Sequence, residues 1–178
     1  MLSEILQQIK DQLIRAKYQK KHPFRYFVLT TTEESGSPRA RTVVLRHFDP
    51  QEMTLTIYTD QRSQKVKALT QHKEACMLFY DPKKLWQIQV MTRLIQQSGD
   101  SKIFQSLPPP AQKDYTTQQA PGSVIANPDE VTYLNGQHFF MALTFKILSI
   151  ESLKLKRPNH VRSLFELQNK WAGSYLNP

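Results

Sequence analysis

Hydroxyl and cationic side chains gather in residues 59–65, where a strand is predicted to end and a helix to begin. Thr59 and Ser63 supply hydroxyl donors, and Arg62 and Lys65 supply positive charge within reach of the same point. The first turn of a helix adds unpaired backbone N–H groups and the positive end of the helix dipole, which favour an anion. This mixture suits a phosphate group. An ordinary capped helix with solvated basic side chains explains the same residues, because serine is a common N-cap residue.

Two arginines share one face of a predicted strand with apolar residues. Successive side chains of a strand alternate, so Arg39 and Arg41 lie on the face of Val43 and Leu45, while Arg46 falls on the other face. Burying a guanidinium is costly without an anion or a carboxylate beside it. A solvated edge strand explains Arg39, and less readily Arg41. The stretch therefore favours an anion beside Arg41.

Gln87 is a third polar candidate, in a predicted strand where glutamine alternates with apolar residues. A primary amide both donates and accepts hydrogen bonds, which suits the polar edge of a flavin or a nucleobase. A half-solvated strand explains the same alternation. No metal site is expected, because none of the five histidines belongs to an H-E-x-x-H motif or has a C-x-x-C companion. Cys76 is the only cysteine, so an intrachain disulfide is excluded.

Composition narrows the class of partner. The formal net charge of +9 favours an anionic partner such as a nucleic acid, an acidic lipid or a phosphorylated small molecule. Aromatic and basic residues do not interleave, which disfavours a nucleic-acid-binding barrel. No apolar run approaches the roughly 18 residues of a membrane span, and residues 1–4 lack the layout of a signal peptide. These features favour a cytoplasmic protein without a membrane partner.

The elements that must position these residues follow from periodicity and turn signals. Apolar residues at helical spacing predict a helix over residues 3–20 with Ser3 as its N-cap. Strands are predicted at 24–32, 39–48, 53–59, 75–80, 85–96 and 139–150, a short crossover helix at 63–71, and a helix at 101–107 that the prolines at 108–110 end. Residues 111–129 are expected to form a loop, and 153–178 to mix turns with one or two short strands. This order predicts a mostly β, mainly antiparallel barrel with α decoration, in one domain over residues 1–178.

Taken together, the three stretches resemble one known family. The order Arg41-Thr42-Val43-Val44-Leu45-Arg46, then Tyr58-Thr59, Ser63, Lys65 and Gln87 is similar to that of the pyridoxamine 5'-phosphate oxidase-like FMN-binding split-barrel family. The similarity extends over residues 24–97, and a fainter one near the C-terminus includes His160, Arg162 and Trp171. The resemblance implies an FMN-binding split β-barrel with a core over about 24–150, completed, with the dimer and flavin site, by residues 151–178.

The resemblance also implies residue roles. Arg41, Ser63 and Lys65 would hold the FMN phosphate, and the backbone of residues 41–46 would lie against the isoalloxazine ring. Gln87 would hydrogen-bond the ring. The family forms homodimers with FMN at the subunit interface, so Arg162 would approach the flavin from the partner subunit, and Arg46 and His160 would lie on the substrate side. The cofactor-binding candidates are Arg41, Thr42, Val43, Val44, Leu45, Arg46, Tyr58, Thr59, Ser63, Gln64, Lys65, Gln87 and Arg162.

Departures from the family pattern lie mainly on the substrate side. Gln64 stands where the true oxidases carry an arginine, and Arg46 where they use a lysine. Ile103, Leu107 and Ala111 replace the tyrosine, arginine and serine that hold the substrate phosphate in those enzymes. The sequence therefore favours an FMN-dependent oxidoreductase acting on an unidentified small molecule over a strict vitamin B6 oxidase. The alternatives are a non-catalytic flavin-binding or stress-related module and, less favoured, a basic nucleic-acid-binding barrel.

Overall fold

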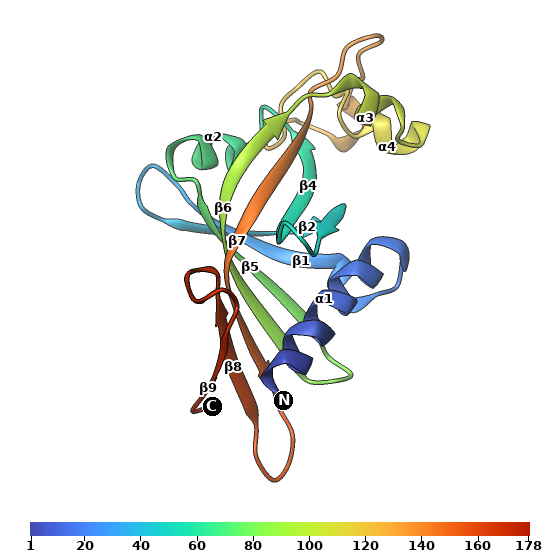
Figure 1. The fold of residues 1–178 in the computed structure, drawn as a ribbon. Helices are drawn as coiled ribbons and strands as arrows, with labels where there is room; N and C mark the ends of the chain where they lie inside the picture. Colours follow the sequence, from blue (N-terminus) through green and yellow to red (C-terminus); the bar gives the residue numbers. More distant parts are fainter.

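A computed structural model describes residues 1–178, which form one nine-stranded sheet with helices at its edges and ends (Figure 1). In chain order the elements are α1 (Leu2–Tyr18), β1 (Tyr26–Thr32), β2 (Pro38–Val44), β3 (His47–Asp49), β4 (Thr54–Asp60), α2 (Gln64–Gln71), β5 (Glu74–Asp81), β6 (Trp86–Ser98), α3 (Ser101–Gln105), α4 (Pro109–Lys113), β7 (Phe140–Lys154), β8 (Val161–Glu166) and β9 (Gly173–Leu176). Short 3-10 helices lie at Pro23–Arg25, Pro128–Glu130 and Leu167–Asn169. None of the helices combines the length and the apolar character that a membrane span requires.

Every strand pair in the sheet is antiparallel, which confirms the predicted fold class. The strand order is β2-β1-β5-β6-β7-β4-β3. In addition, β8 pairs with residues 149–154 of β7, and β9 pairs with β8. Hydrogen bonds do not close this sheet into a complete cylinder. β2 pairs only with β1, and β3 covers only Thr54–Thr56 of β4. The free edge of β2 and residues 57–60 of β4 therefore flank the opening, or split, in the barrel.

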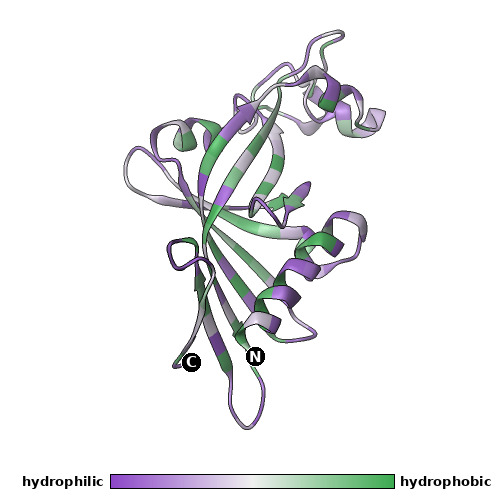
Figure 2. Cartoon of the chain, in the orientation of Figure 1, coloured by the Kyte–Doolittle hydropathy of each residue, from purple (hydrophilic) through white to green (hydrophobic).

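The core lies on the inner face of the curved sheet, where alternate residues of each strand are buried. On β1 these are Phe27 and Leu29, and their neighbours Phe79 and Met77 on β5 are equally buried. Figure 2 shows this alternation as changing hydropathy along the strands. The apolar stripe of α1, which includes Leu13, packs against the same cluster of 25 buried residues. At about 25 cal/mol per Å² of buried apolar surface, this cluster is the main source of stability.

The outer face of the sheet is only partly covered, although several of its residues are apolar. Leu78 on β5, Leu153 on β7 and Leu164 on β8 are half-buried, and Tyr80 is 47% exposed. Gln87 lies among them, since it pairs with Tyr80 on one side and Leu153 on the other. An apolar strip of this kind is typical of a surface that contacts another molecule.

Three local predictions are wrong. Ser3 lies inside α1, whose N-cap is Met1, because the chain amine pairs with Glu4 and the helix begins two residues earlier. The strand predicted over residues 39–48 breaks after β2, because the backbone N–H of Arg46 turns away to donate to Thr56 O at 3.0 Å. The loop expected over residues 111–129 is interrupted, because residues 111–113 belong to α4. Pro109 begins this helix, since a proline at the first helical position gives up no hydrogen bond.

Candidate functional site

The end of β4 and the start of α2 bring Thr59, Ser63 and Lys65 together. Thr59 and Ser63 are buried, and their hydroxyl oxygens lie 3.2 Å apart. Lys65 Nζ donates to Thr59 Oγ1 at 2.9 Å. Ser63 is the N-cap residue of α2, yet its hydroxyl makes no capping hydrogen bond. The backbone N–H groups of Gln64 and Lys65 also have no partner, so several donors face one point at the start of the helix.

Arg41 brings a second cation to this point from β2. Its side chain lies on the inner face of the sheet, where Nη1 donates to Thr31 Oγ1 at 2.8 Å and to Leu29 O at 3.3 Å. Neither Arg41 nor Lys65 forms an ion pair with a carboxylate.

Burial and the neighbouring charge of Arg41 lower the pKa of Lys65, and the charge of Asp60 offsets only part of this decrease. Burial and the charge of Arg39 likewise lower the pKa of Arg41. Two desolvated cations that repel each other are stabilised by an anion placed between them. The residues present therefore fit the phosphate of a flavin nucleotide.

Arg62, which the sequence placed at the same anion, has a different position. Its guanidinium forms a bidentate ion pair with buried Asp60, with Nε at 3.0 Å from Oδ1 and Nη2 at 2.7 Å from Oδ2. Its Nη1 and Nη2 groups donate to backbone carbonyl oxygens of residues 117–119. None of its donors bonds to Thr59, which accepts from Lys65. The sequence could not distinguish Arg62 from Lys65, because both are cations within the same short turn.

A second group of side chains surrounds Arg46 on the outer face of β4. The guanidinium of Arg46 lies 5.3 Å from the ring centre of Tyr58, and its Nε is buried without a partner. Tyr115 stands beside both, and burial raises its pKa against the opposing charge of Arg46. Tyr58 and Tyr115 both pack edge-on against Phe140. Tyr115 was missed because nothing in the polar stretch around it marks one aromatic residue as buried.

The apolar part of this second cluster comes from the segment that carries α3 and α4. Ile103 and Leu107 are partly buried and pack against the cluster of Tyr115, Phe140 and Ala142. The resemblance found in the sequence implies that polar substrate-binding groups stand at these two positions in the true oxidases. The structure thus shows apolar contacts of these two residues with the cluster that includes Tyr115, the neighbour of Arg46.

The strand predicted to lie against a flavin ring is an edge strand. Thr42, Val43 and Val44 belong to β2, whose outer edge has no partner strand. Leu45 is buried, and its N–H donates to Arg25 O at 2.9 Å. Backbone N–H and C=O groups on an unpaired edge remain available to a ligand with a polar rim.

Gln87, His160 and Arg162 lie away from the Arg41 and Lys65 cluster. Gln87 projects from the outer face of the sheet, opposite to the inner face that carries Arg41. Figure 1 shows β8 and β9 at the end of the molecule opposite to α2. Arg162 on β8 is half-buried and pairs with Glu151 at 2.8 Å, while His160 is exposed in the turn before it. One chain does not bring these residues together with Lys65.

The chain matches one known protein family. Residues 4–96, just over half of the chain, match the family model described as the pyridoxamine 5'-phosphate oxidase, FMN-binding domain. The chain therefore belongs to this family of FMN-binding domains, and FMN is confirmed as the cofactor predicted from the sequence. No curated protein matches the chain.

Solved structures share the fold over most of the chain. A pyridoxamine 5'-phosphate oxidase-related, FMN-binding protein from Nostoc punctiforme is 22% identical with a TM-score of 0.76, and the match covers 94% of this chain and 95% of that one. PhzG from Burkholderia lata, solved in complex with tetrahydrophenazine-1-carboxylic acid, is 17% identical with a TM-score of 0.79 and coverages of 97% and 91%. General stress protein 26 from Bacillus anthracis is 15% identical with a TM-score of 0.55 and coverages of 86% and 98%. At these identities the likeness establishes the fold alone.

Proposed function

We propose that this protein is an FMN-dependent oxidoreductase that binds the cofactor phosphate between Arg41, Ser63 and Lys65. The observation that carries the proposal is the pair of desolvated cations, Arg41 and Lys65, with no carboxylate on either. Thr59 and Ser63 add hydroxyls, and Gln64 and Lys65 add free backbone N–H groups. When bound, FMN supplies hydride and electron transfer, while the protein supplies orientation and electrostatics.

The isoalloxazine ring belongs against the free edge of β2 and residues 57–60 of β4. Thr42, Val43 and Val44 offer backbone groups there, and Tyr58 offers an aromatic side chain. The substrate belongs beside Arg46, whose buried Nε has no partner within the chain. The surrounding Tyr58 and Tyr115 give this region an apolar and phenolic lining. A small molecule with one anionic or hydrogen-bond-accepting group fits this environment better than a phosphate monoester, which needs several cations.

FMN binding tests the first part of the proposal directly. Purified protein titrated with FMN should quench flavin fluorescence with one saturable site per chain. Binding weaker than about 30 µM, or roughly −6 kcal/mol, would contradict the proposed site. A Lys67→Gln variant is the matched control, because Lys67 is exposed on the same helix as Lys65 and has no role in the phosphate site.

We further propose that two chains share each flavin. Gln87 and Arg162 lie on the outer face and at the far end of the sheet, so they can serve a flavin held by Lys65 only on a second chain. The partly covered apolar residues Leu78, Leu153 and Leu164 surround them. A two-fold dimer would bury this strip from both chains at once.

Mixed dimers separate this arrangement from two independent sites. A chain carrying Lys65→Gln is paired with a chain carrying Arg162→Gln, using two different affinity tags. If each site takes Lys65 from one chain and Arg162 from the other, one site per dimer is intact and the other has lost both residues. Tight FMN binding at half of the sites supports the shared site. Weakened FMN binding at both sites, with no intact site, would show that Lys65 and Arg162 of the same chain serve the same flavin.

A further inference from the structure

Arg62 uses its donors to hold one distant segment of the chain. Nη1 donates to Gln118 O at 3.0 Å, and Nη2 donates to Thr117 O at 2.9 Å. The guanidinium carbon lies 3.3 Å from the centre of the Phe139 ring. Asp60 fixes the other side of the same guanidinium. The side chain of Arg62 is therefore enclosed by residues that belong to both ends of one long excursion between α4 and β7.

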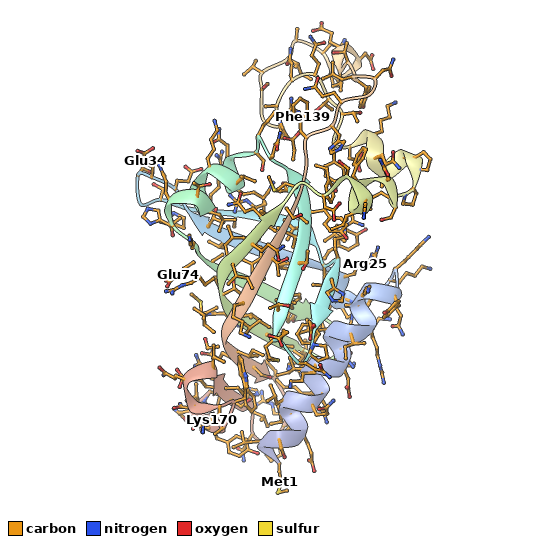
Figure 3. All side chains as sticks on the ribbon, turned by 45° about the horizontal axis from the view of Figure 1, so that its top comes forward. Met1, Arg25, Glu34, Glu74, Phe139 and Lys170 are labelled. Atoms are coloured by element: carbon orange, nitrogen blue, oxygen red, sulfur yellow. The ribbon has the colours of Figure 1, made fainter.

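This excursion, residues 115–139, is attached mainly at its ends, where Tyr115 packs on Phe140 and His138 stacks on Phe104 with ring centres 3.9 Å apart. Its base is closed by Phe139 N donating to Tyr115 O at 2.8 Å and Leu134 N donating to Thr116 O at 2.7 Å. Residues 121–130 are all exposed, and none of them joins a hydrophobic cluster. Figure 2 colours much of this region as hydrophilic, and Figure 3 shows it around Phe139 at the end of the molecule far from Met1. Segments with few buried apolar contacts open at low free-energy cost.

Arg62 also lies in the middle of the turn that we assign to the cofactor phosphate. Ser63 follows it directly, and Lys65 lies two residues after Ser63. The neighbouring Gln61 N–H donates to Phe139 O at 2.8 Å, which adds a second link between this turn and the excursion. The first residue of the excursion is Tyr115, which stands beside Arg46. A single short turn thus connects the phosphate site to the segment that covers the substrate side.

We propose that Arg62 is a positioning residue that couples occupancy of the phosphate site to the order of residues 115–139. The inference rests on the proposed function, because it assumes that a phosphate binds at Ser63 and Lys65. An anion held by this turn reduces the motion of its backbone and therefore of the Arg62 guanidinium. The carbonyl groups of Thr117 and Gln118 then keep a fixed donor, so opening of the excursion becomes less favourable. Coupling of this kind is reciprocal, so an ordered excursion in turn favours FMN binding.

Hydrogen exchange measured by mass spectrometry tests the coupling on the full chain, with and without FMN. We expect FMN to slow exchange within residues 115–139 by about fivefold or more in the wild type. In Arg62→Gln the same amides should exchange faster without FMN, and FMN should no longer slow them. Arg93→Gln is the matched control, because Arg93 forms an exposed ion pair with Glu74 and touches no part of the excursion. It should behave as the wild type.

Further measurements keep the proposal distinct from its alternatives. Phe139→Leu removes the ring under the guanidinium while leaving Arg62 charged, so it should weaken the same protection even if Arg62→Gln folds poorly. FMN binding is measured in the same samples by flavin fluorescence. If the wild type fails to bind FMN, the proposed function fails, while unchanged exchange in FMN-free Arg62→Gln overturns the positioning role. If Arg62→Gln loses the preference for FMN over riboflavin as strongly as Lys65→Gln does, Arg62 is a phosphate ligand and the proposal is wrong.

Discussion

Replacing Lys65 by glutamine should weaken FMN binding while leaving riboflavin binding almost unchanged. Lys65 Nζ is within 2.9 Å of Thr59 Oγ1 and has no carboxylate partner, so its charge is available to a phosphate. A hydrogen bond to a charged group contributes roughly 1.5–3 kcal/mol, which corresponds to about 10- to 150-fold in the dissociation constant. Riboflavin lacks the phosphate, so its affinity should change by no more than about twofold.

The same substitution should not destabilise the FMN-free protein. Burial and the charge of Arg41 lower the pKa of Lys65, so the folded protein disfavours the charged form. Removing that charge relieves the repulsion with Arg41. We therefore expect the thermal midpoint of FMN-free Lys65→Gln to equal or exceed that of the wild type. In the wild type, FMN at 100 times its dissociation constant adds about 2.7 kcal/mol, or roughly 5–10 °C in the midpoint.

The pH dependence provides an independent check of the same residue. Lys65 must be charged to hold a phosphate, and its pKa in the free protein lies below the ordinary value of 10.5. FMN affinity should therefore fall as the pH rises through this lowered pKa, and Lys65→Arg should remove that fall. Titrations of FMN and riboflavin by fluorescence, with thermal scans of the same samples, give all the quantities needed. Equal losses for the two ligands, or a lower midpoint of the FMN-free variant, would refute the assignment of Lys65 to the phosphate.

Further predictions concern stability and substrate choice. Burial and the charge of Lys84 lower the pKa of His22, so unfolding free energy should decrease as the pH falls below 6.5, and His22→Asn should remove this decrease in denaturant titrations. Gly173→Ala should cost about 1–3 kcal/mol, because a Cβ there would overlap the Phe165 ring; Gly99→Ala, which meets only ordinary contacts, should be near neutral by the same titrations. Steady-state assays under air should give a kcat/KM for pyridoxamine phosphate below about 10⁴ M⁻¹s⁻¹, and a higher value would contradict the apolar substrate side.

Much of the fold could be predicted from local signals. The apolar stripe that predicts residues 3–20 as a helix corresponds to α1, and the alternation around Leu55 and Ile57 corresponds to β4. The break at Arg46 could not be predicted, because its cause is a hydrogen bond to Thr56 on another strand. Period-two patterning reports which face a residue occupies and gives no information about where pairing stops.

The candidate site was predictable in part for a related reason. The hydroxyls of Thr59 and Ser63 and the amine of Lys65 meet because they lie within one turn. Arg41 joins them across the split, and its apolar neighbours on the strand were the signal that located it. Arg62 could not be separated from Lys65, because its partners lie on a segment more than 50 residues away in the sequence, at Thr117 and Gln118. Tyr115 had no pattern that distinguished it from its polar surroundings.

The unpaired edge of β2 has a consequence for solubility. Exposed strand edges are templates on which further chains add as extra strands, and natural sheets suppress this association with proline and charged side chains. β2 begins at Pro38 and carries Arg39 and Arg41, which would meet the same charges on an approaching copy of the strand. We therefore expect Arg39 and Arg41 to oppose edge-to-edge association of the FMN-free chain. Neutralising Arg41 should increase light scattering by FMN-free protein during heating, and added FMN should lower the scattering of the wild type by occupying the edge.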